Sequence, residues 1–154
     1  TVTAANSSSI SDGAAALVLM RLSEAERRGL KPLAAIRGHA THAQAPAWFT
    51  TAPVGAMRGL LERVGWSTRD VELWEVNEAF AVVAMAAIRE LDLPRDRVNI
   101  HGGACALGHP IGASGARILV TLLNALEKHG MTRGVASLCI GGGEATAMAV
   151  ERLH

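Results

Sequence analysis

The chain has 154 residues, of which 49% are hydrophobic and 19% charged, and it carries a formal net charge of +1. One domain's length with this much apolar content excludes a disordered polar chain. The nearly balanced charge, with no basic stripe interleaved with aromatics, gives no reason to expect nucleic acid as a partner. No apolar run reaches the roughly 18 residues of a membrane span, so no membrane association is expected.

The beginning of the chain is predicted to alternate strand, helix and strand. The apolar run at residues 13–20 follows turn-forming residues, which predicts a buried strand. Ser23 is the predicted N-cap of a short helix, because Glu26 stands three residues later as in a capping box, and Gly29 is its predicted end. A second strand is predicted over residues 32–43.

The middle of the chain continues this alternation. A loop is expected at 46–53, and a helix over 54–64 carries apolar residues at three- and four-residue spacing. A strand is predicted at 71–77, and the following helix, 78–91, is apolar nearly all round, which predicts burial on several sides. Residues 97–102 are predicted to form another strand.

The end of the chain contributes one long helix and a pair of strands. An apolar stripe predicts a helix that ends at Gly130; its members are Ile118, Leu122, Leu123 and Leu126. Two strands, 134–140 and 145–152, are joined by the short segment 141–144. Alternating strands and helices that end in paired strands predict an α/β fold, with a layered mixed β-sheet flanked by helices.

Three polar residues stand at positions where an open α/β sheet gathers its chemistry, just beyond strand ends. They are Asn77 after a strand, His109 before the long helix and Cys139 before three glycines. Each has a purely structural alternative: Asn77 as the cap of the next helix, His109 as an ordinary loop residue, and Cys139 as a small core residue. Cys105 has the same alternative as Cys139, and nothing chemical accompanies it.

Several segments resemble the signatures of the thiolase family. VNEAFA at 76–81, NIHGGACALGHPIGASGAR at 99–117 and CIGGGEA at 139–145 resemble the three signatures of the family's C-terminal half. TAANSSSISDGAAALVL at 3–19 resembles the segment that ends the N-terminal half. The resemblance spans essentially the whole chain and implies a thiolase-fold C-terminal domain.

The resemblance implies catalytic roles for four residues. His109 corresponds to the histidine that activates a nucleophilic cysteine and then donates a hydrogen bond to a thioester oxygen. Asn77 corresponds to the asparagine that holds a water beside that histidine. Cys139 corresponds to the cysteine that exchanges a proton with the substrate α-carbon, and Gly141 to the glycine whose N–H completes an oxyanion hole.

The same resemblance implies that the substrate is a coenzyme A thioester. Ser8 corresponds to a serine that touches the pantetheine of CoA, and Phe80 lies where the family lines the pantetheine tunnel. Coenzyme A acts as a substrate in this family, so no separate cofactor and no metal are expected.

The family's acyl-accepting cysteine lies in an N-terminal half that precedes the signatures found here. Residues 1–22 are therefore assigned to the last strand segment of the thiolase N-terminal domain and residues 23–154 to the C-terminal domain. The implied partners are acyl-CoA or CoA, the N-terminal half, and further copies in a homodimer or homotetramer. Two cysteines form no disulfide framework, which favours the cytoplasm.

The leading function is therefore the C-terminal half of a thiolase, which is inactive without its upstream nucleophile. One alternative is a decarboxylating condensing enzyme of the same superfamily, but such enzymes generally place a histidine where Asn77 stands and lack the second cysteine. The other alternative is a non-catalytic module that binds or scaffolds with the same fold. The joint presence of Asn77, His109 and Cys139 argues against it.

Overall fold

The computed structural model describes residues 2–153, and its centre is a four-stranded mixed sheet with the strand order β1-β4-β3-β2. The strands are β1 (Ala34–Ala43), β2 (Leu73–Val76), β3 (Arg133–Ile140) and β4 (Glu144–Arg152). Strands β2 and β3 are parallel, whereas β4 runs antiparallel to both of its neighbours. The predicted layered mixed sheet is thereby confirmed.

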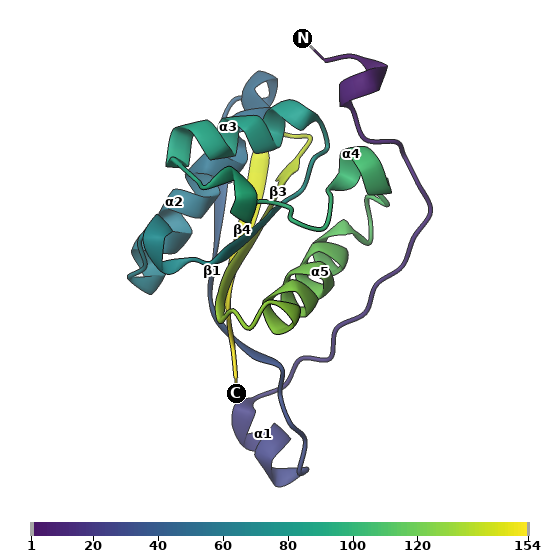
Figure 1. Ribbon diagram of the computed structural model, residues 1–154. Helices are drawn as coiled ribbons and strands as arrows, with labels where there is room; N and C mark the ends of the chain where they lie inside the picture. The colour runs from purple at the N-terminus through teal and green to yellow at the C-terminus, as the bar shows by residue number, and fades with distance from the viewer. Residues whose placement is uncertain (1, 154) are drawn as a thin grey trace.

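Helices cover both faces of this sheet (Figure 1). The helices α2 (Ala52–Val64) and α3 (Ala81–Leu91) pack on one face, and α5 (Ser114–Lys128) packs on the other. The shorter helices are α1 (Leu22–Arg27), α4 (Ala104–Leu107) and the 3₁₀ turns η1 (Ala4–Asn6), η2 (Pro46–Thr51), η3 (Thr68–Asp70) and η4 (Arg95–Arg97). None of the helices described in residues 2–153 is long and apolar enough to cross a membrane.

Alternation along the strands divides the buried residues into two cores. On β2, Trp74 and Val76 face α2 and α3, whereas Leu73 packs against α5. All four residues of β2 are buried, and one of them is the acidic residue Glu75. Because side chains alternate along a strand, Glu75 shares the face of Leu73 and lies on the side of α5.

Helix boundaries follow the expected local chemistry with one exception. Helix α2 ends before Gly65, and α5 is followed by Gly130; both glycines have the left-handed backbone that ends a helix, with φ of 69° and 65°. Helix α1 begins at Leu22, so Ser23 lies inside the helix and the prediction that it is the N-cap is wrong. The predicted loop at 46–53 contains the 3₁₀ turn η2 and the start of α2.

Two predicted strands are absent from the described chain. Residues 13–20 form no strand and are largely exposed, with Val18 87% and Leu19 64% accessible, so the expectation of a buried strand is wrong for this chain. A strand needs a neighbour for its ladder, and none of the four sheet strands supplies one here. At 97–102, only Val98 makes an isolated parallel bridge, to Trp74.

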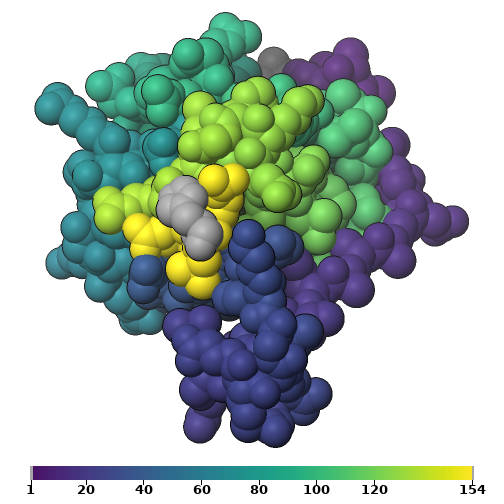
Figure 2. Space-filling view, turned by 60° about the horizontal axis from the view of Figure 1, so that its bottom comes forward, coloured from purple at the N-terminus to yellow at the C-terminus, as the bar shows by residue number. Residues whose placement is uncertain are grey.

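The N-terminal segment crosses the surface instead of entering a sheet. From η1 it runs past α4 and α5 to α1, which lies at the far end of the sheet (Figure 1). The space-filling view shows α1 standing out from the rest of the molecule, with the N-terminal segment along the flank (Figure 2). Two isolated bridges join this segment to the body of the chain, one at the start of α3 and one in the loop before α5, and Cys105 of α4 contacts the carbonyl of Asn6.

Candidate active site

The loop between α4 and α5 places His109 at the edge of the sheet where β2 and β3 end. Its backbone N–H donates to the carbonyl of Ser9 over 2.9 Å, and the neighbouring Ile10 forms a parallel bridge with it. The imidazole Nδ1 lies 2.6 Å from Oγ of Ser114, the first residue of α5. The N-terminal segment and α5 therefore hold His109 from two sides.

Ser114 determines which nitrogen of His109 carries the proton in the neutral ring. Its hydroxyl donates its single hydrogen to the carbonyl of Pro110, 3.0 Å away. The same oxygen must then accept at the His109 contact, so Nδ1 of His109 is the donor. In the neutral ring this leaves Nε2 as an unprotonated acceptor.

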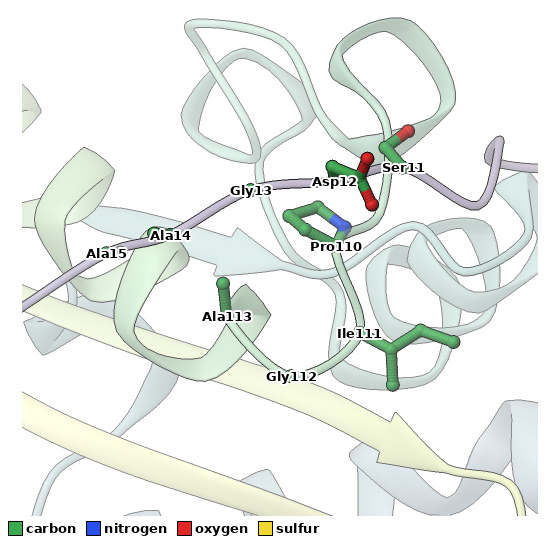
Figure 3. Close-up of a pocket in the computed structure, with 9 residues that line it drawn as sticks. All are labelled: Ser11, Asp12, Gly13, Ala14, Ala15, Pro110, Ile111, Gly112 and Ala113. Atoms are coloured by element: carbon green, nitrogen blue, oxygen red, sulfur yellow. The ribbon is translucent and has the colours of Figure 1, made fainter.

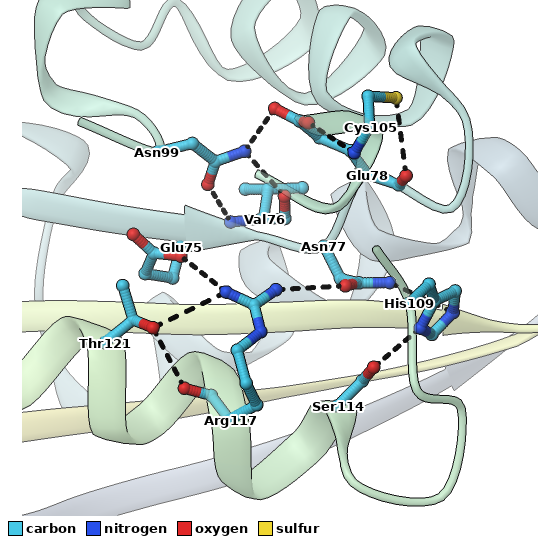
Figure 4. Close-up of polar contacts among 10 residues, drawn as sticks. All are labelled: Glu75, Val76, Asn77, Glu78, Asn99, Cys105, His109, Ser114, Arg117 and Thr121. Atoms are coloured by element: carbon cyan, nitrogen blue, oxygen red, sulfur yellow. Dashed lines mark hydrogen bonds and ion pairs between the residues drawn. The ribbon is translucent and has the colours of Figure 1, made fainter. Parts of the chain in front are cut away.

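Asn77 follows β2 directly and is 1% exposed. Its backbone N–H donates to the carbonyl of Ser137 on β3 over 2.9 Å, which extends the parallel ladder by one bond. The side-chain Nδ2 lies 3.3 Å from Nε2 of His109 (Figure 4). The N-cap of α3 is Phe80, so the alternative in which Asn77 caps that helix is wrong.

Burial lowers the pKa of His109, and the positive charge of Arg117 lowers it further. Both effects act against the protonated ring. His109 is therefore neutral near pH 7, with Nε2 available to take a proton.

Cys139 lies near the end of β3, paired with Ala145 of β4, and is 8% exposed. It packs with the core on the side of α2 and α3. Burial raises the pKa of its thiol, so the protonated form is favoured at neutral pH. Cys139 and Asn77 thus reach the same edge of the sheet from neighbouring strands, but among the described residues no hydrogen bond joins Cys139 to His109.

Gly141 begins the turn between β3 and β4 and is exposed. A side chain at this position would meet no other atom of the chain within 4 Å. Gly143, two residues on, differs because its φ of 102° and the nearby carbonyl of Gln44 leave no room for a side chain. The turn itself requires glycine at 143, whereas Gly141 leaves open space beside the end of β3.

The structure brings Ser8 and Phe80 together, although they are 72 positions apart in the chain. Ser7 forms an antiparallel bridge with Phe80, and both the N–H and the hydroxyl of Ser8 donate to the carbonyl of Ala79, over 3.1 and 3.0 Å. The Phe80 ring packs edge-on against Phe49, with centroids 5.9 Å apart. Both residues are half-buried, so part of each side chain remains accessible.

The N-terminal segment also forms one wall of a hollow beside His109. Residues 11–15 line it on one side and residues 110–113 on the other (Figure 3). Gly13 approaches the ring of Pro110 so closely that a side chain there would collide with it. The segment therefore packs directly against the loop that carries His109.

Three polar residues next to this site were missed by the sequence analysis: Glu75, Ser114 and Arg117. Glu75 was detectable as an acidic residue between the apolar residues Trp74 and Val76 of a predicted strand. Arg117 lies one turn beyond Ser114 on α5, and both point to the side of Asn77 and His109 (Figure 4). No metal-binding group of three or more His, Cys, Asp or Glu side chains occurs within the described part of the chain.

This geometry agrees with the family to which the sequence is matched. Residues 30–152 match the family description "Thiolase, C-terminal domain", and the chain belongs to the thiolase family. The cytosolic acetyl-CoA acetyltransferase of Mus musculus is 56% identical over 152 residues, which are 99% of this chain and 38% of that protein. The acetyl-CoA acetyltransferase of Escherichia coli is 51% identical over 154 residues, 100% of this chain and 39% of that protein.

Solved structures show the same fold. The acetyl-CoA acetyltransferase of Bacillus anthracis superimposes with a TM-score of 0.96 at 47% identity, covering 99% of this chain and 39% of that one. Human mitochondrial 3-ketoacyl-CoA thiolase superimposes with a TM-score of 0.91 at 36% identity and the same coverage. The chain therefore has the fold of a thiolase C-terminal domain and spans somewhat more than a third of the length of these relatives.

Proposed function

We propose that this chain is the C-terminal catalytic half of a thiolase, and that with its N-terminal half it transfers acyl groups to CoA by reversible Claisen cleavage of 3-ketoacyl-CoA. Two relatives with the same fold bear the names acetyl-CoA acetyltransferase and 3-ketoacyl-CoA thiolase. The observation that carries the proposal is His109, whose Nε2 is held as an acceptor beside a buried amide at the sheet edge that Cys139 also reaches.

His109 is proposed as the base that activates the acyl-accepting thiol of the N-terminal half. Nucleophilic catalysis by a thiol needs a nearby base to form the thiolate. The lowered pKa of His109 keeps the ring neutral, and the Ser114 contact leaves Nε2 as the acceptor, next to the Asn77 amide. Once Nε2 has taken the proton, it becomes a donor for the thioester oxygen.

Asn77 supports the same oxygen-binding site. In thiolase chemistry, negative charge develops on thioester oxygens, and fixed donors at those oxygens are the largest single source of stabilisation. The direct 3.3 Å approach of the Asn77 amide to His109 places a second N–H donor beside Nε2. The loss of one such donor lowers the rate by roughly 10²–10³-fold in comparable sites.

Cys139 is proposed to exchange a proton with the α-carbon of the substrate. Burial holds it as a thiol, which can return a proton to the enolate that carbon–carbon cleavage leaves behind. The backbone N–H of Gly141 is proposed to stabilise the enolate oxygen, because the position has open space beside it at the end of β3. Condensation uses the same groups in reverse.

Ser8 and Phe80 are proposed to line the binding site of the CoA pantetheine. The Ser8 hydroxyl donates to Ala79, which leaves its oxygen free to accept a hydrogen bond from a pantetheine amide. Phe80 supplies the adjacent apolar surface. Coenzyme A is the substrate, and no further cofactor is part of the proposal.

The proposed partners are the thiolase N-terminal half, with residues 1–22 completing its sheet, and further copies of the same protein in a homodimer or homotetramer. A cytoplasmic location is proposed as well, since the name of the mouse relative places that protein in the cytosol.

Reconstitution with a thiolase N-terminal half tests this function. The pair should cleave acetoacetyl-CoA in the presence of CoA, whereas neither chain alone should do so. His109→Ala should abolish acylation of the upstream cysteine, measured by mass spectrometry with acetyl-CoA. The matched control is His101→Ala, a histidine of the same loop region that contacts His129 and not Asn77. Normal acylation by His109→Ala, or thiolysis by this chain alone, would refute the proposal.

A further inference from the structure

The contacts of Asn77 continue behind the site into a pair of charged groups. Arg117 Nη2 lies 3.5 Å from Oδ1 of Asn77, and Nη1 lies 3.9 Å from Oε2 of Glu75 (Figure 4). The Glu75 side chain is 3% exposed and that of Arg117 is 19% exposed. Arg117 therefore connects a buried carboxyl to the amide that contacts His109.

Arginine constrains how the Asn77 amide can be oriented. A guanidinium has five N–H donors and no acceptor, so only the oxygen of the amide can face it favourably. With Oδ1 directed to Arg117, the NH₂ group of Asn77 must face His109. The opposite orientation would set the NH₂ group against a cation and the oxygen against Nε2, so that both contacts would be lost.

An NH₂ group at that position requires an acceptor on the imidazole. Nε2 satisfies it only when it carries a lone pair, which is the state that Ser114 also selects through Nδ1. Two independent contacts, one at each ring nitrogen, thus specify the same tautomer of His109. Arg117 determines one of these contacts, because it orients the Asn77 amide.

We propose that Arg117, anchored by the buried carboxyl of Glu75, is a positioning residue that holds the Asn77 NH₂ group toward His109 and thereby keeps Nε2 of His109 as the unprotonated acceptor. Its benefit for catalysis rests on the proposed function, because an activating base must begin the reaction unprotonated. The orientation itself follows from the contacts within this chain.

The charges of the pair act on His109 in opposite directions. Arg117 disfavours protonation of His109, and an ionised Glu75 partly cancels that effect by neutralising Arg117. Burial raises the pKa of Glu75 to about 7, against the attraction of Arg117 and with a further contribution from Glu78. The net field on His109 therefore depends on both members of the pair.

Buried ion pairs of this kind seldom add stability over an apolar pair of the same volume. The contacts of the Arg117 guanidinium are long, at 3.5 Å to Asn77, 3.5 Å to Thr121 and 3.9 Å to Glu75. A fold alone gains little from this arrangement. The orientation of Asn77 accounts for an arginine at this position better than packing does.

The test is a pH titration of ¹⁵N-histidine-labelled full chain by NMR, with His109→Ala used to assign the His109 signal. The wild type should show His109 with its proton on Nδ1. Arg117→Gln should raise the pKa of His109 and weaken the preference for the Nδ1-protonated tautomer, because glutamine can both accept and donate and the Ser114 contact then acts alone. Arg117→Lys, which keeps a donor-only cation, should restore the single tautomer. Glu75→Gln should leave the pKa of His109 nearly unchanged, because the Glu75 carboxyl, with its pKa raised to about 7, is largely protonated where His109 titrates.

The controls separate this effect from a general disturbance of the fold. Arg133→Gln removes the same charge at the other end of β3, where Arg133 pairs with Glu151, and should leave the His109 titration unchanged. If Arg117→Gln does not fold, Arg117→Met, which removes the cation and both guanidinium contacts, decides the test and should also raise the pKa of His109. A wild-type His109 protonated on Nε2, or an unchanged titration in Arg117→Gln or Arg117→Met, would overturn the proposal. Because the NMR titration needs no substrate, its result does not depend on whether the protein has thiolase activity.

Discussion

At the scale of single residues, burial drives the titratable groups of the site toward their neutral forms. It lowers the pKa of His109 and raises those of Cys139 and Glu75. The candidate site therefore holds a neutral imidazole and a neutral thiol at the same pH. That combination suits a reaction in which protons are exchanged between sulfur, nitrogen and carbon.

Cys139 and Cys105 form a natural matched pair for mutation, because only Cys139 is buried at the sheet edge. In a reconstituted enzyme, Cys139→Ala should lower thiolysis and condensation by at least about 10²-fold, the order of magnitude of a lost acid–base group. Acylation of the upstream cysteine should persist. Cys105→Ala should retain thiolysis within about twofold, and an equal loss in both variants would rule out a specific role for Cys139.

The ionisation of Glu75 should make the free energy of unfolding depend on pH. Because the pKa is raised in the folded chain, to about 7 from 4.5, the stability contributed by the protonated carboxyl is complete below pH 4.5 and is lost as the pH rises through 7. Glu75→Gln cannot ionise, so its stability relative to the wild type should improve between pH 5 and pH 8. Urea unfolding at the two pH values measures this, with the exposed Glu62→Gln as the baseline. A constant difference between Glu75→Gln and the wild type would contradict the expectation.

At the scale of elements, the sequence predicted the helices and strands whose formation depends on local residue patterns. The helices at 54–64 and 78–91 and the strands at 134–140 and 145–152 were predicted within a few residues, because their apolar periodicity matches the faces they bury. The strand at 13–20 failed for a non-local reason. Its sequence favours a strand, but a strand forms only where a neighbouring strand completes its hydrogen bonds.

The candidate site shows the same division between local and distant information. His109, Asn77 and Cys139 were found through signatures along the chain. The pairing of Glu75 with Arg117 depends on which face of β2 meets α5, and that follows only from the complete sheet register. Ser114 was within a recognised signature, but its role required the hydroxyl to be seen between Pro110 and His109.

Helix α5 offers a direct test of the core that supports this register. Leu122 is fully buried beneath the sheet, whereas Val120 is 42% exposed on the same helix. Leu122→Ala should lower the free energy of unfolding by about 2–5 kcal/mol, the usual cost of removing a buried leucine side chain. Val120→Ala should change it by less than about 1 kcal/mol. Equal effects in urea unfolding would mean that α5 is not packed as described.

At the scale of the whole molecule, α3 leaves apolar side chains uncovered. Met85 is 64% exposed and Val82 is 42% exposed, and both line an open groove between α3 and neighbouring segments. Exposed apolar surface costs about 25 cal/mol per Å² relative to burial. The proposed N-terminal half is the partner that would cover this face.

Met85→Lys should therefore raise the dissociation constant for a separately expressed thiolase N-terminal half by at least about tenfold. Titration of one chain with the other measures this constant, and size-exclusion chromatography with light scattering shows whether the complex forms. A lysine within an apolar interface loses its hydration without gaining a partner. Leu33→Lys, just before β1 at the end of the sheet opposite to the site, introduces the same charge on an exposed residue and should leave association unchanged. If Met85→Lys binds the N-terminal half as tightly as the wild type does, this face of α3 is not the interface.

The hydrogen bond from the His109 N–H to the Ser9 carbonyl joins residues on the two sides of the position where the family match begins. The match to the family's C-terminal domain begins at residue 30, yet the backbone that supports the proposed base, His109, comes from Ser9 and the proposed pantetheine contact from Ser8. The segment that matches the family's C-terminal domain is thus shorter than the segment whose residues meet at the candidate site. Thiolase halves can be fused, permuted or exchanged at residue 30. Such a change would keep the matched domain intact but would remove the backbone contact that Ser9 makes with His109.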